Sequence, residues 1–169
     1  TLDRISGSLA YADVAAAEWN GLDGTACPFL RHEFLLALEE TGCVAPATGW
    51  TPCHLLLRSA AGRLLGAMPL YSKTSSYGEF VFDWAWADAY RRAGLRYFPK
   101  LVSAVPFTPA TSPRLLHAPG EEPDRIGSAL LSASTELARQ LEASSVHVLF
   151  PTDRESGLLA RAGFLSRKD

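Results

Sequence analysis

The stretch Tyr77–Tyr90 reads Tyr-Gly-Glu-Phe-Val-Phe-Asp-Trp-Ala-Trp-Ala-Asp-Ala-Tyr, and its composition is the most unusual in the chain. It combines six of the 17 aromatic residues (Trp 4, Tyr 5, Phe 8) with three carboxylates, Glu79, Asp83 and Asp88. From Phe80 to Trp86 the rings fall on every second residue, so a β-strand would separate rings from carboxylates by face. We expect the rings to pack and the carboxylates to be available for chemistry.

The second part of this stretch also fits a helix from about Trp84 through Ala93 that stops at Gly94. Asp83 would then either cap the helix or act as a catalytic group, and both readings stay open. On that helix Asp88 forms a surface ion pair with Arg91 or Arg92. The rings of Phe80, Phe82, Trp84 and Trp86 are expected in the core, although an exposed tryptophan would indicate a ligand platform.

The whole chain has the composition of one soluble globular domain spanning residues 1–169. It is 47% hydrophobic and 20% charged, with a net charge of −2, which argues against binding duplex nucleic acid. The three cysteines show no metal-ligand or disulfide spacing, and no apolar run approaches a membrane span. We therefore expect a cytoplasmic protein with reduced thiols.

The order of expected elements is that of an α/β (α+β) fold with a mixed sheet flanked by helices. Strands are expected at 4–9, 53–58, 64–72, 101–116 (interrupted by prolines), 146–150 (central and buried) and 164–168. Residues 77–83 are expected to form either a strand or an irregular extension. Helices are expected at 12–19, 29–41, 84–93, 125–143 and 156–162, the last with an N-cap at Thr152.

Several kinds of site are excluded by their missing motifs. The chain has no P-loop, dinucleotide fingerprint or nucleophile elbow, and its four histidines have no metal-ligand spacing. What remains is the carboxylate group of residues 79, 83 and 88, with Lys73, Tyr77, Tyr90 and Thr108 as helpers. An enzyme that acylates amines needs a base, an oxyanion donor and a wall that excludes water. Glu79 or Asp83 would be the base.

Seven short motifs resemble a bacterial family of predicted N-acyltransferases, labelled peptidoglycan biosynthesis/recognition proteins. They are Pro28-Phe29-Leu30, Gly49-Trp50, Tyr71-x-Lys73, Ser76-Tyr77-Gly78-Glu79, Phe82-Asp83-Trp84-Ala85-Trp86-Ala87, Tyr97-x-Pro99-Lys100-Leu101 and Pro106-Phe107-Thr108-Pro109. That family is similar to the Fem-type aminoacyl transferases of the GNAT superfamily. The resemblance implies a GNAT-like acyl-CoA N-acyltransferase fold.

Members of this family look about twice as long as the chain, with two GNAT-like halves. The resemblance therefore implies that residues 1–169 are an N-terminal half, completed by a C-terminal half or a second subunit. It implies acyl-CoA or aminoacyl-tRNA as donor, without a metal. GNAT enzymes that bind acyl-CoA hold its diphosphate in a Gly-rich loop before the main helix. Here residues 114–127 have the wrong glycine spacing and three acidic residues, so CoA does not suit this helix.

The sequence thus predicts the acceptor-side half of an N-acyltransferase acting on a small amine or peptide. The residues expected to bind the acceptor are Tyr77, Trp84, Trp86, Asp88, Lys100, Phe107 and Thr108. The alternative is a non-catalytic module that recognises a peptide, sugar or amine through the same tryptophans and carboxylates.

Overall fold

The structure, a computed structural model, describes residues 4–8, 10–81 and 83–167. Its strands are β1 (Arg4–Ser8), β2 (Trp50–Pro52), β3 (His54–Arg58), β4 (Leu64–Met68), β5 (Tyr71–Lys73), β6 (Lys100–Ser103), β7 (Leu116–His117) and β8 (Val146–Val148). Its α-helices are α1 (Ala16–Asn20), α2 (His32–Glu40), α3 (Trp84–Arg92), α4 (Pro123–Gln140) and α5 (Asp153–Arg161). Short 3₁₀ helices span Tyr11–Asp13, Pro28–Leu30 and Pro46–Thr48.

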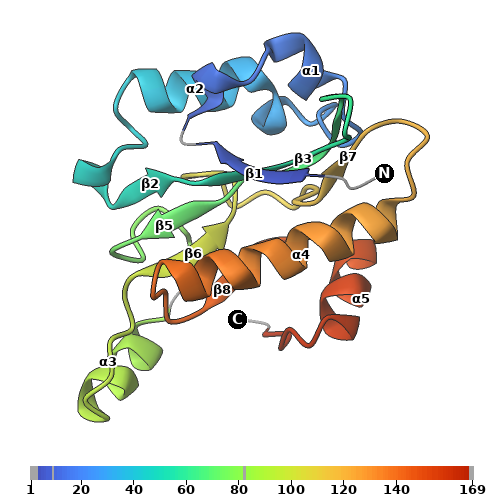
Figure 1. The fold of residues 1–169 in the computed structure, drawn as a ribbon. Helices are drawn as coiled ribbons and strands as arrows, with labels where there is room; N and C mark the ends of the chain where they lie inside the picture. Colours follow the sequence, from blue (N-terminus) through green and yellow to red (C-terminus); the bar gives the residue numbers. More distant parts are fainter. Residues whose placement is uncertain (1–3, 9, 82, 168–169) are drawn as a thin grey trace.

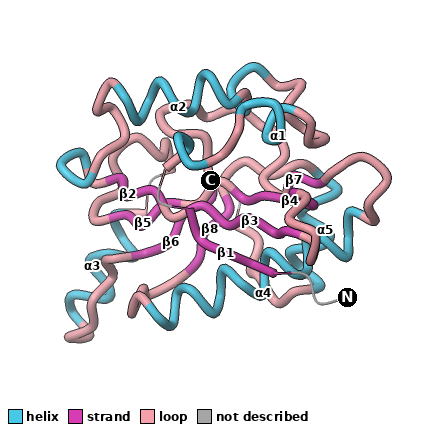
Figure 2. Tube along the Cα trace, turned by 45° about the horizontal axis from the view of Figure 1, so that its top comes forward, coloured by secondary structure: helices cyan, strands magenta, loops and turns pink. Residues whose placement is uncertain are grey.

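The strands form two four-stranded sheets, ordered β1-β3-β4-β7 and β2-β5-β6-β8. The two sheets join end to end, because β2 runs into β3 and β4 into β5, and the Cys53 amide donates to the Leu70 carbonyl at 2.9 Å between them. All pairings are antiparallel except that of β6 with β8. Helices α1 and α2 cover one face, while α4 and α5 cover the other (Figures 1 and 2).

The core is formed on both faces of this layer. One cluster joins α4 to the strands through Leu57, Leu65, Ile126 and Leu130, and another joins α1 and α2 to the opposite face through Tyr11, Trp19 and Leu35. Gly66 of β4 lets α4 approach closely: a Cβ there would lie 2.3 Å from Ile126 Cγ2 and 2.8 Å from the Leu116 carbonyl oxygen.

A methyl group at position 66 should therefore push α4 from the sheet. We expect Gly66→Ala to lower the free energy of unfolding by about 1–3 kcal/mol, measured by urea denaturation. The matched control is Gly157→Ala in α5, where the nearest atom is 3.6 Å away, so helix propensity should raise stability by about 0.5–1 kcal/mol. Equal stability of the Gly66→Ala variant and the wild type would contradict the close contact.

The expected α+β class, the hairpin of β3 and β4, the helices α3 and α4, and the Thr152 cap of α5 are confirmed. Of the two alternatives for residues 77–83, the described residues 77–81 take the irregular one and not the strand. Three expectations were wrong. β8 is a half-buried edge strand; residues 164–167 are not a strand; and only 16–20 of the first expected helix are α-helical. The error at β8 arose because its apolar run was taken as evidence of burial on both faces, whereas β8 is an edge strand that pairs with β6 and packs against α4.

The interruption expected at residues 101–116 is real. β6 pairs with β5, β7 pairs with β4, and residues 104–115 leave the sheet between them as a loop. This loop carries Phe107 and Thr108 toward the segment that holds the carboxylates, since the Phe107 amide donates to the Gly78 carbonyl at 3.0 Å.

Candidate functional site

Lys100, the first residue of β6, is the centre of a buried charge cluster. Its side chain is fully buried, and its ammonium group has three N–H donors. All three have partners: Glu79 Oε2 at 2.8 Å, Asp83 Oδ2 at 2.5 Å and Ser76 Oγ at 3.1 Å. Tyr97 donates its hydroxyl to the same Asp83 oxygen at 2.6 Å.

The cluster forms because residues 76–81 and Asp83 lie over the start of β6. Gly78, with φ of 77°, makes the bend, and the ring of Phe107 occupies the space where a side chain at 78 would lie, only 2.5 Å from a Cβ there. The bend turns Glu79 inward so that its side chain is 1% exposed. Asp83 follows immediately before α3 and is 6% exposed.

The two carboxylates have different electrostatic environments. Burial raises the pKa of Glu79, and the attraction of Lys100 only partly offsets it. Burial also acts to raise the pKa of Asp83, but the hydrogen-bonding groups of Lys100, Ser76 and Tyr97 outweigh it, so that pKa is lowered. Glu79 Oε1 and Asp83 Oδ1 are buried and have no hydrogen-bond partner among the described residues. Each is a free acceptor at the cluster.

A second buried lysine, Lys73 of β5, lies next to the cluster. Its ammonium donates to the Tyr77 carbonyl at 2.9 Å and lies 3.6 Å from the centre of the Trp50 ring. Burial lowers the pKa of Lys73 to about 8, and Lys100 contributes to this shift. From the sequence, Lys73 was expected only to assist the carboxylates. In the structure it lies directly opposite Lys100, because β5 and β6 pair in that register.

The aromatic residues lie on the side opposite to the one expected. The carboxylates Glu79 and Asp83 point inward, whereas Phe80, Trp84 and Trp86 are 55%, 59% and 53% exposed. The interpretation of these rings as core was wrong, and Phe82 lies outside the described residues. The reason is the irregular backbone of 77–81, including a φ of 57° at Phe80, which removes the alternation a strand would impose.

Asp83 occupies the N-cap position of α3 but makes no capping hydrogen bond with its side chain. Its carboxylate is used by Lys100 and Tyr97 instead, so the interpretation of Asp83 as a side-chain cap was wrong. Asp88 forms the expected surface ion pairs, with Arg91 and with Arg92, the latter at 2.8 Å. Asp88 is therefore held away from the cluster on the outer side of α3.

The remaining expected residues form the rim. Tyr77 is 74% exposed and Phe107 41%, and the Phe107 ring lies 5.6 Å from that of Trp50. Thr108 donates its hydroxyl to the Pro106 carbonyl at 3.1 Å, within its own loop. The structure thus brings together Glu79, Asp83 and Lys100, with Tyr77 and Phe107 beside them.

His147 of β8 also lies beside the cluster, a position that its local sequence does not indicate. Its imidazole Nε2 lies 2.8 Å from Ser145 Oγ, and its ring lies 6.4 Å from the Tyr97 ring. Burial lowers the pKa of His147 to about 4, with Lys100 adding to the effect and Asp83 opposing it.

This shift predicts an acid-labile fold. An unfolded histidine takes up a proton near pH 6.5, whereas native His147 resists it until about pH 4, so stability is lost as pH falls through that window. We expect His147→Asn to remove about 2 kcal/mol of the difference in unfolding free energy between pH 7 and pH 4.5. An unchanged pH dependence in the variant, compared with a His117→Asn control, would rule this out.

A different histidine, His54, serves the fold. Its Nδ1 accepts from the Leu70 amide at 3.1 Å, so its Nε2 carries the proton and donates to Glu39 Oε1 at 3.0 Å. Glu39 also accepts from the Tyr11 amide, which ties α2 to the sheet. Among the described residues no group of three or more metal-ligating side chains is assembled.

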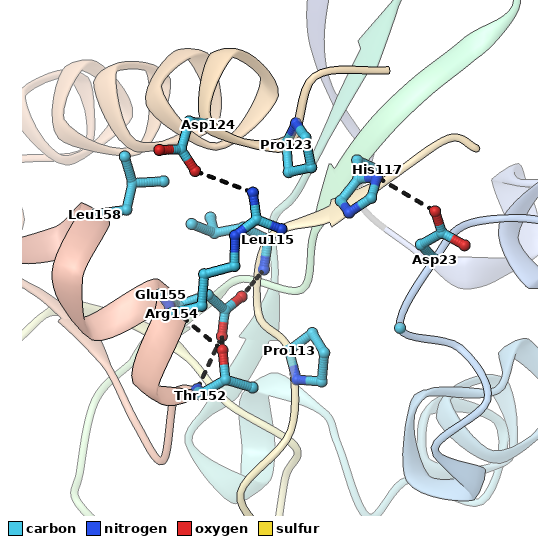
Figure 3. Close-up of a pocket in the computed structure, with 11 residues that line it drawn as sticks. Asp23, Pro113, Leu115, His117, Pro123, Asp124, Thr152, Arg154, Glu155 and Leu158 are labelled. Carbon is cyan, nitrogen blue, oxygen red and sulfur yellow. Dashed lines mark hydrogen bonds and ion pairs between the residues drawn. The ribbon is translucent and has the colours of Figure 1, made fainter. Parts of the chain in front are cut away.

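The start of α4 is the place where this fold could hold a phosphate-bearing donor, and a pocket of about 120 Å³ lies there between β7, α4 and α5 (Figure 3). Its lining includes three acidic residues, Asp23, Asp124 and Glu155. At the helix N-terminus the Glu122 carboxylate accepts from the amides of Asp124 at 3.1 Å and Arg125 at 2.5 Å. The chain's own anion therefore occupies the amides that would bind a diphosphate, and CoA does not fit this position.

Comparison with known proteins gives one family and a set of similar folds. A family model described as FemAB-like, peptidoglycan biosynthesis/recognition, matches residues 10–169. No curated protein matches the chain. A solved structure of a probable acetyltransferase is 16% identical, with a TM-score of 0.58 over 98% of this chain and 91% of that one.

Two further structures have the same fold. The ribosomal-protein-alanine N-acetyltransferase from Brucella melitensis biovar Abortus is 14% identical, with a TM-score of 0.55 over 100% of this chain and 94% of its own. The aminoglycoside 6'-N-acetyltransferase AAC(6')-Ih from Acinetobacter baumannii is 11% identical, with a TM-score of 0.55 over 99% and 94%. At these identities the likeness shows a GNAT-like fold.

Proposed function

The chain belongs to the FemAB-like family, and we propose that it forms the acceptor side of an N-acyltransferase that acts on an amine. The observation that carries this proposal is the buried cluster of Lys100, Glu79 and Asp83 at the end of a GNAT-like sheet, with a free carboxylate oxygen on each acid. Such oxygens, buried and unpaired, suit an incoming ammonium group better than they suit a purely structural role.

In this proposal Glu79 is the base. Its raised pKa makes it the better proton acceptor of the two acids, because Asp83 is held anionic by Lys100 and Tyr97. Glu79 Oε1 takes a proton from the acceptor ammonium, and the freed nitrogen forms a bond to the acyl carbon. The donor's leaving group departs with the electron pair of the broken bond and takes up the second proton that the nitrogen loses as the amide forms. Lys100 and Asp83 position Glu79, while Tyr77 and Phe107 form the wall beside it.

The experiment is a transfer assay of the chain with and without the C-terminal half that the family resemblance implies, on a panel of amines and amino-terminal peptides, using acetyl-CoA and aminoacyl-tRNA as alternative donors. We expect Glu79→Gln to lower kcat/KM by about a hundredfold, since general base catalysis contributes about 10²–10⁴. Asp88→Asn is the matched control, because that carboxylate pairs with Arg91 and Arg92 on the exposed side of α3. Full activity of the Glu79→Gln variant would refute the assignment of the base.

We propose that the N-terminus of α4 in this chain does not bind the acyl donor. We therefore expect CoA and ADP to leave the thermal unfolding midpoint unchanged, since a ligand that does not bind the native state cannot stabilise it. Glu122→Ala should lower stability by about 1 kcal/mol through loss of its two capping bonds. A midpoint raised by CoA in the wild type would show that a diphosphate displaces Glu122.

The exposed rings favour a second candidate, a module that recognises a ligand without turnover. Tyr77, Trp84 and Trp86 are large, exposed and close in sequence, which is the pattern of a binding platform. The two candidates differ in one result. Loss of ligand affinity in Trp84→Ala, with no transfer by the wild type in any donor and amine combination, would favour recognition.

A further inference from the structure

Three fully buried side chains lie in one row across β2, β5 and β6, which run side by side in Figure 1. Trp50 pairs directly opposite Lys73, and Lys73 pairs directly opposite Lys100. Side chains directly opposite one another lie on the same face of a sheet, so the row presents an indole and two ammonium groups to one side. Burying two like charges next to each other is costly, so packing alone does not account for the row.

The row holds the loop of residues 76–81, which carries Glu79. The Tyr77 carbonyl accepts two hydrogen bonds, one from the Lys73 ammonium at 2.9 Å and one from Trp50 Nε1 at 3.1 Å. These two donors match the two lone pairs of a carbonyl oxygen. The Tyr77 ring is 74% exposed, so the loop is attached here through its backbone and not through that side chain. Two members of the row thus fix the peptide group that precedes Gly78 and Glu79.

The next carbonyl of the loop is held from another element. The Gly78 carbonyl accepts from the Phe107 amide at 3.0 Å, and the Phe107 ring packs where a Cβ at position 78 would lie. The residue that follows these two fixed carbonyls is Glu79, and its carboxylate reaches Lys100, the third member of the row, at 2.8 Å. The support beneath Glu79 therefore comes from residues that surround it without reacting, as a preorganised site requires.

The charge of Lys73 acts on Glu79 in addition to its hydrogen bond. Burial raises the pKa of Glu79, and the positive charges of Lys100 and Lys73 act in the opposite direction. Burial lowers the pKa of Lys73 to about 8, with Glu79 opposing this shift and Lys100 adding to it. The Lys73 ammonium also lies 3.6 Å from the centre of the Trp50 ring, which favours its charged form. At pH 7 Lys73 is therefore mainly cationic.

We propose that Lys73 and Trp50 are positioning residues for the base of the transfer reaction, because they hold the Tyr77 carbonyl and so place Glu79. This inference rests on the proposed function, in which Glu79 takes a proton from the acceptor ammonium. Lys73 and Trp50 are fully buried, so they act through the loop and not by touching the acceptor. A residue that only braced the fold would change stability and leave the properties of Glu79 as they are.

The first test needs no transfer activity. The Glu79 carboxyl is titrated by NMR of the side-chain carboxyl carbons, with Glu79→Gln to assign its signal. In Lys73→Met we expect the midpoint of this titration to shift upward, because one of the two cations that lower the pKa is removed. The Phe107 amide, which is bonded to Gly78, should exchange with solvent about tenfold faster, since the loop loses a charge-assisted hydrogen bond. Arg91→Met removes a cation that is 81% exposed and should change neither result.

The second test is kinetic and uses the transfer assay described above. Lys73→Met should lower kcat by about tenfold or more, and Trp50→Phe, which removes the Nε1–H donor and keeps an aromatic ring, by about threefold. Both effects should disappear in the Glu79→Gln background, since a positioning residue acts only through the group that it positions. The acidic limb of the pH profile of kcat/KM should move upward in Lys73→Met. Arg91→Met should retain the wild-type constants.

Two results would overturn the inference. One is a Lys73→Met variant in which the Glu79 titration and the Phe107 exchange equal those of the wild type. The other is a loss of kcat in Lys73→Met that is just as large in the Glu79→Gln background, which would mark a general effect on the fold. Absence of transfer by the wild type would instead refute the proposed function, and the first test would still decide whether Lys73 places Glu79. If circular dichroism shows Lys73→Met unfolded, Trp50→Phe carries the exchange and kinetic measurements.

Discussion

Lys100→Met should lower the free energy of unfolding by about 3–5 kcal/mol, the usual cost of leaving buried charges without their partner. The methionine fills a similar volume, so the loss reflects charge and not a cavity. Two carboxylates, Glu79 and Asp83, would keep their burial and lose the ammonium that binds both. Urea denaturation followed by far-UV circular dichroism measures the effect, and Arg91→Met, at an exposed site, should change stability by less than about 0.5 kcal/mol.

Two further measurements distinguish the loss of the charge interaction from simple misfolding of the Lys100→Met variant: the pH dependence of its stability, and the effect of neutralising the two acids as well. In the Lys100→Met variant the native pKa values of the carboxyl groups should rise above their unfolded values, so the variant should regain stability as pH falls through them. Neutralising the acids as well, in Lys100→Met/Glu79→Gln/Asp83→Asn, should recover most of the loss at pH 7. A triple variant as unstable as the single one would show that the packing around Lys100 dominates.

The elements that the sequence predicts best are those whose pattern lies entirely within one helix or one hairpin. The 18-residue helix α4 has its apolar stripe, and α5 has Thr152 as N-cap with Glu155 three residues later, so both could be predicted from spacing. The hairpin of β3 and β4 was equally local, since Gly62, with φ of 86°, closes it. The motifs around residues 77–87 and 97–101 identified the family before any geometry was known.

The site could be predicted only in part. Glu79, Asp83 and Lys100 were expected as functional residues, but their mutual contacts depend on the bend at Gly78, where the backbone leaves the strand pattern. That bend reversed the expected faces, because period-two alternation has meaning only in extended backbone. Lys73 and His147 joined the cluster through strand pairing across β5, β6 and β8, which no local spacing encodes.

Arg114 is another residue whose role depends on distant contacts. It is fully buried, and its guanidinium donates to the carbonyls of Leu149 at 2.9 Å, Ser112 at 3.0 Å and Ala110 at 3.0 Å, and to the Ser112 hydroxyl at 2.6 Å. Burial lowers its pKa to about 10, which still leaves it charged at neutral pH. It fastens the end of loop 104–115 to the chain just after β8.

Arg114→Met should therefore lower the free energy of unfolding by about 3–5 kcal/mol, since each buried carbonyl left without a donor costs about 1–3 kcal/mol and some will find water. Arg114→Lys keeps the charge but supplies a compact ammonium in place of the planar fork, so it should recover less than half of the loss. The loop also carries Phe107 against Gly78, so in the transfer assay Arg114→Lys should raise KM more than it lowers kcat. A lysine variant with wild-type stability would mean that the charge at position 114 matters and the planar guanidinium does not. Unchanged KM and kcat in the lysine variant would show that the loop does not shape the acceptor wall.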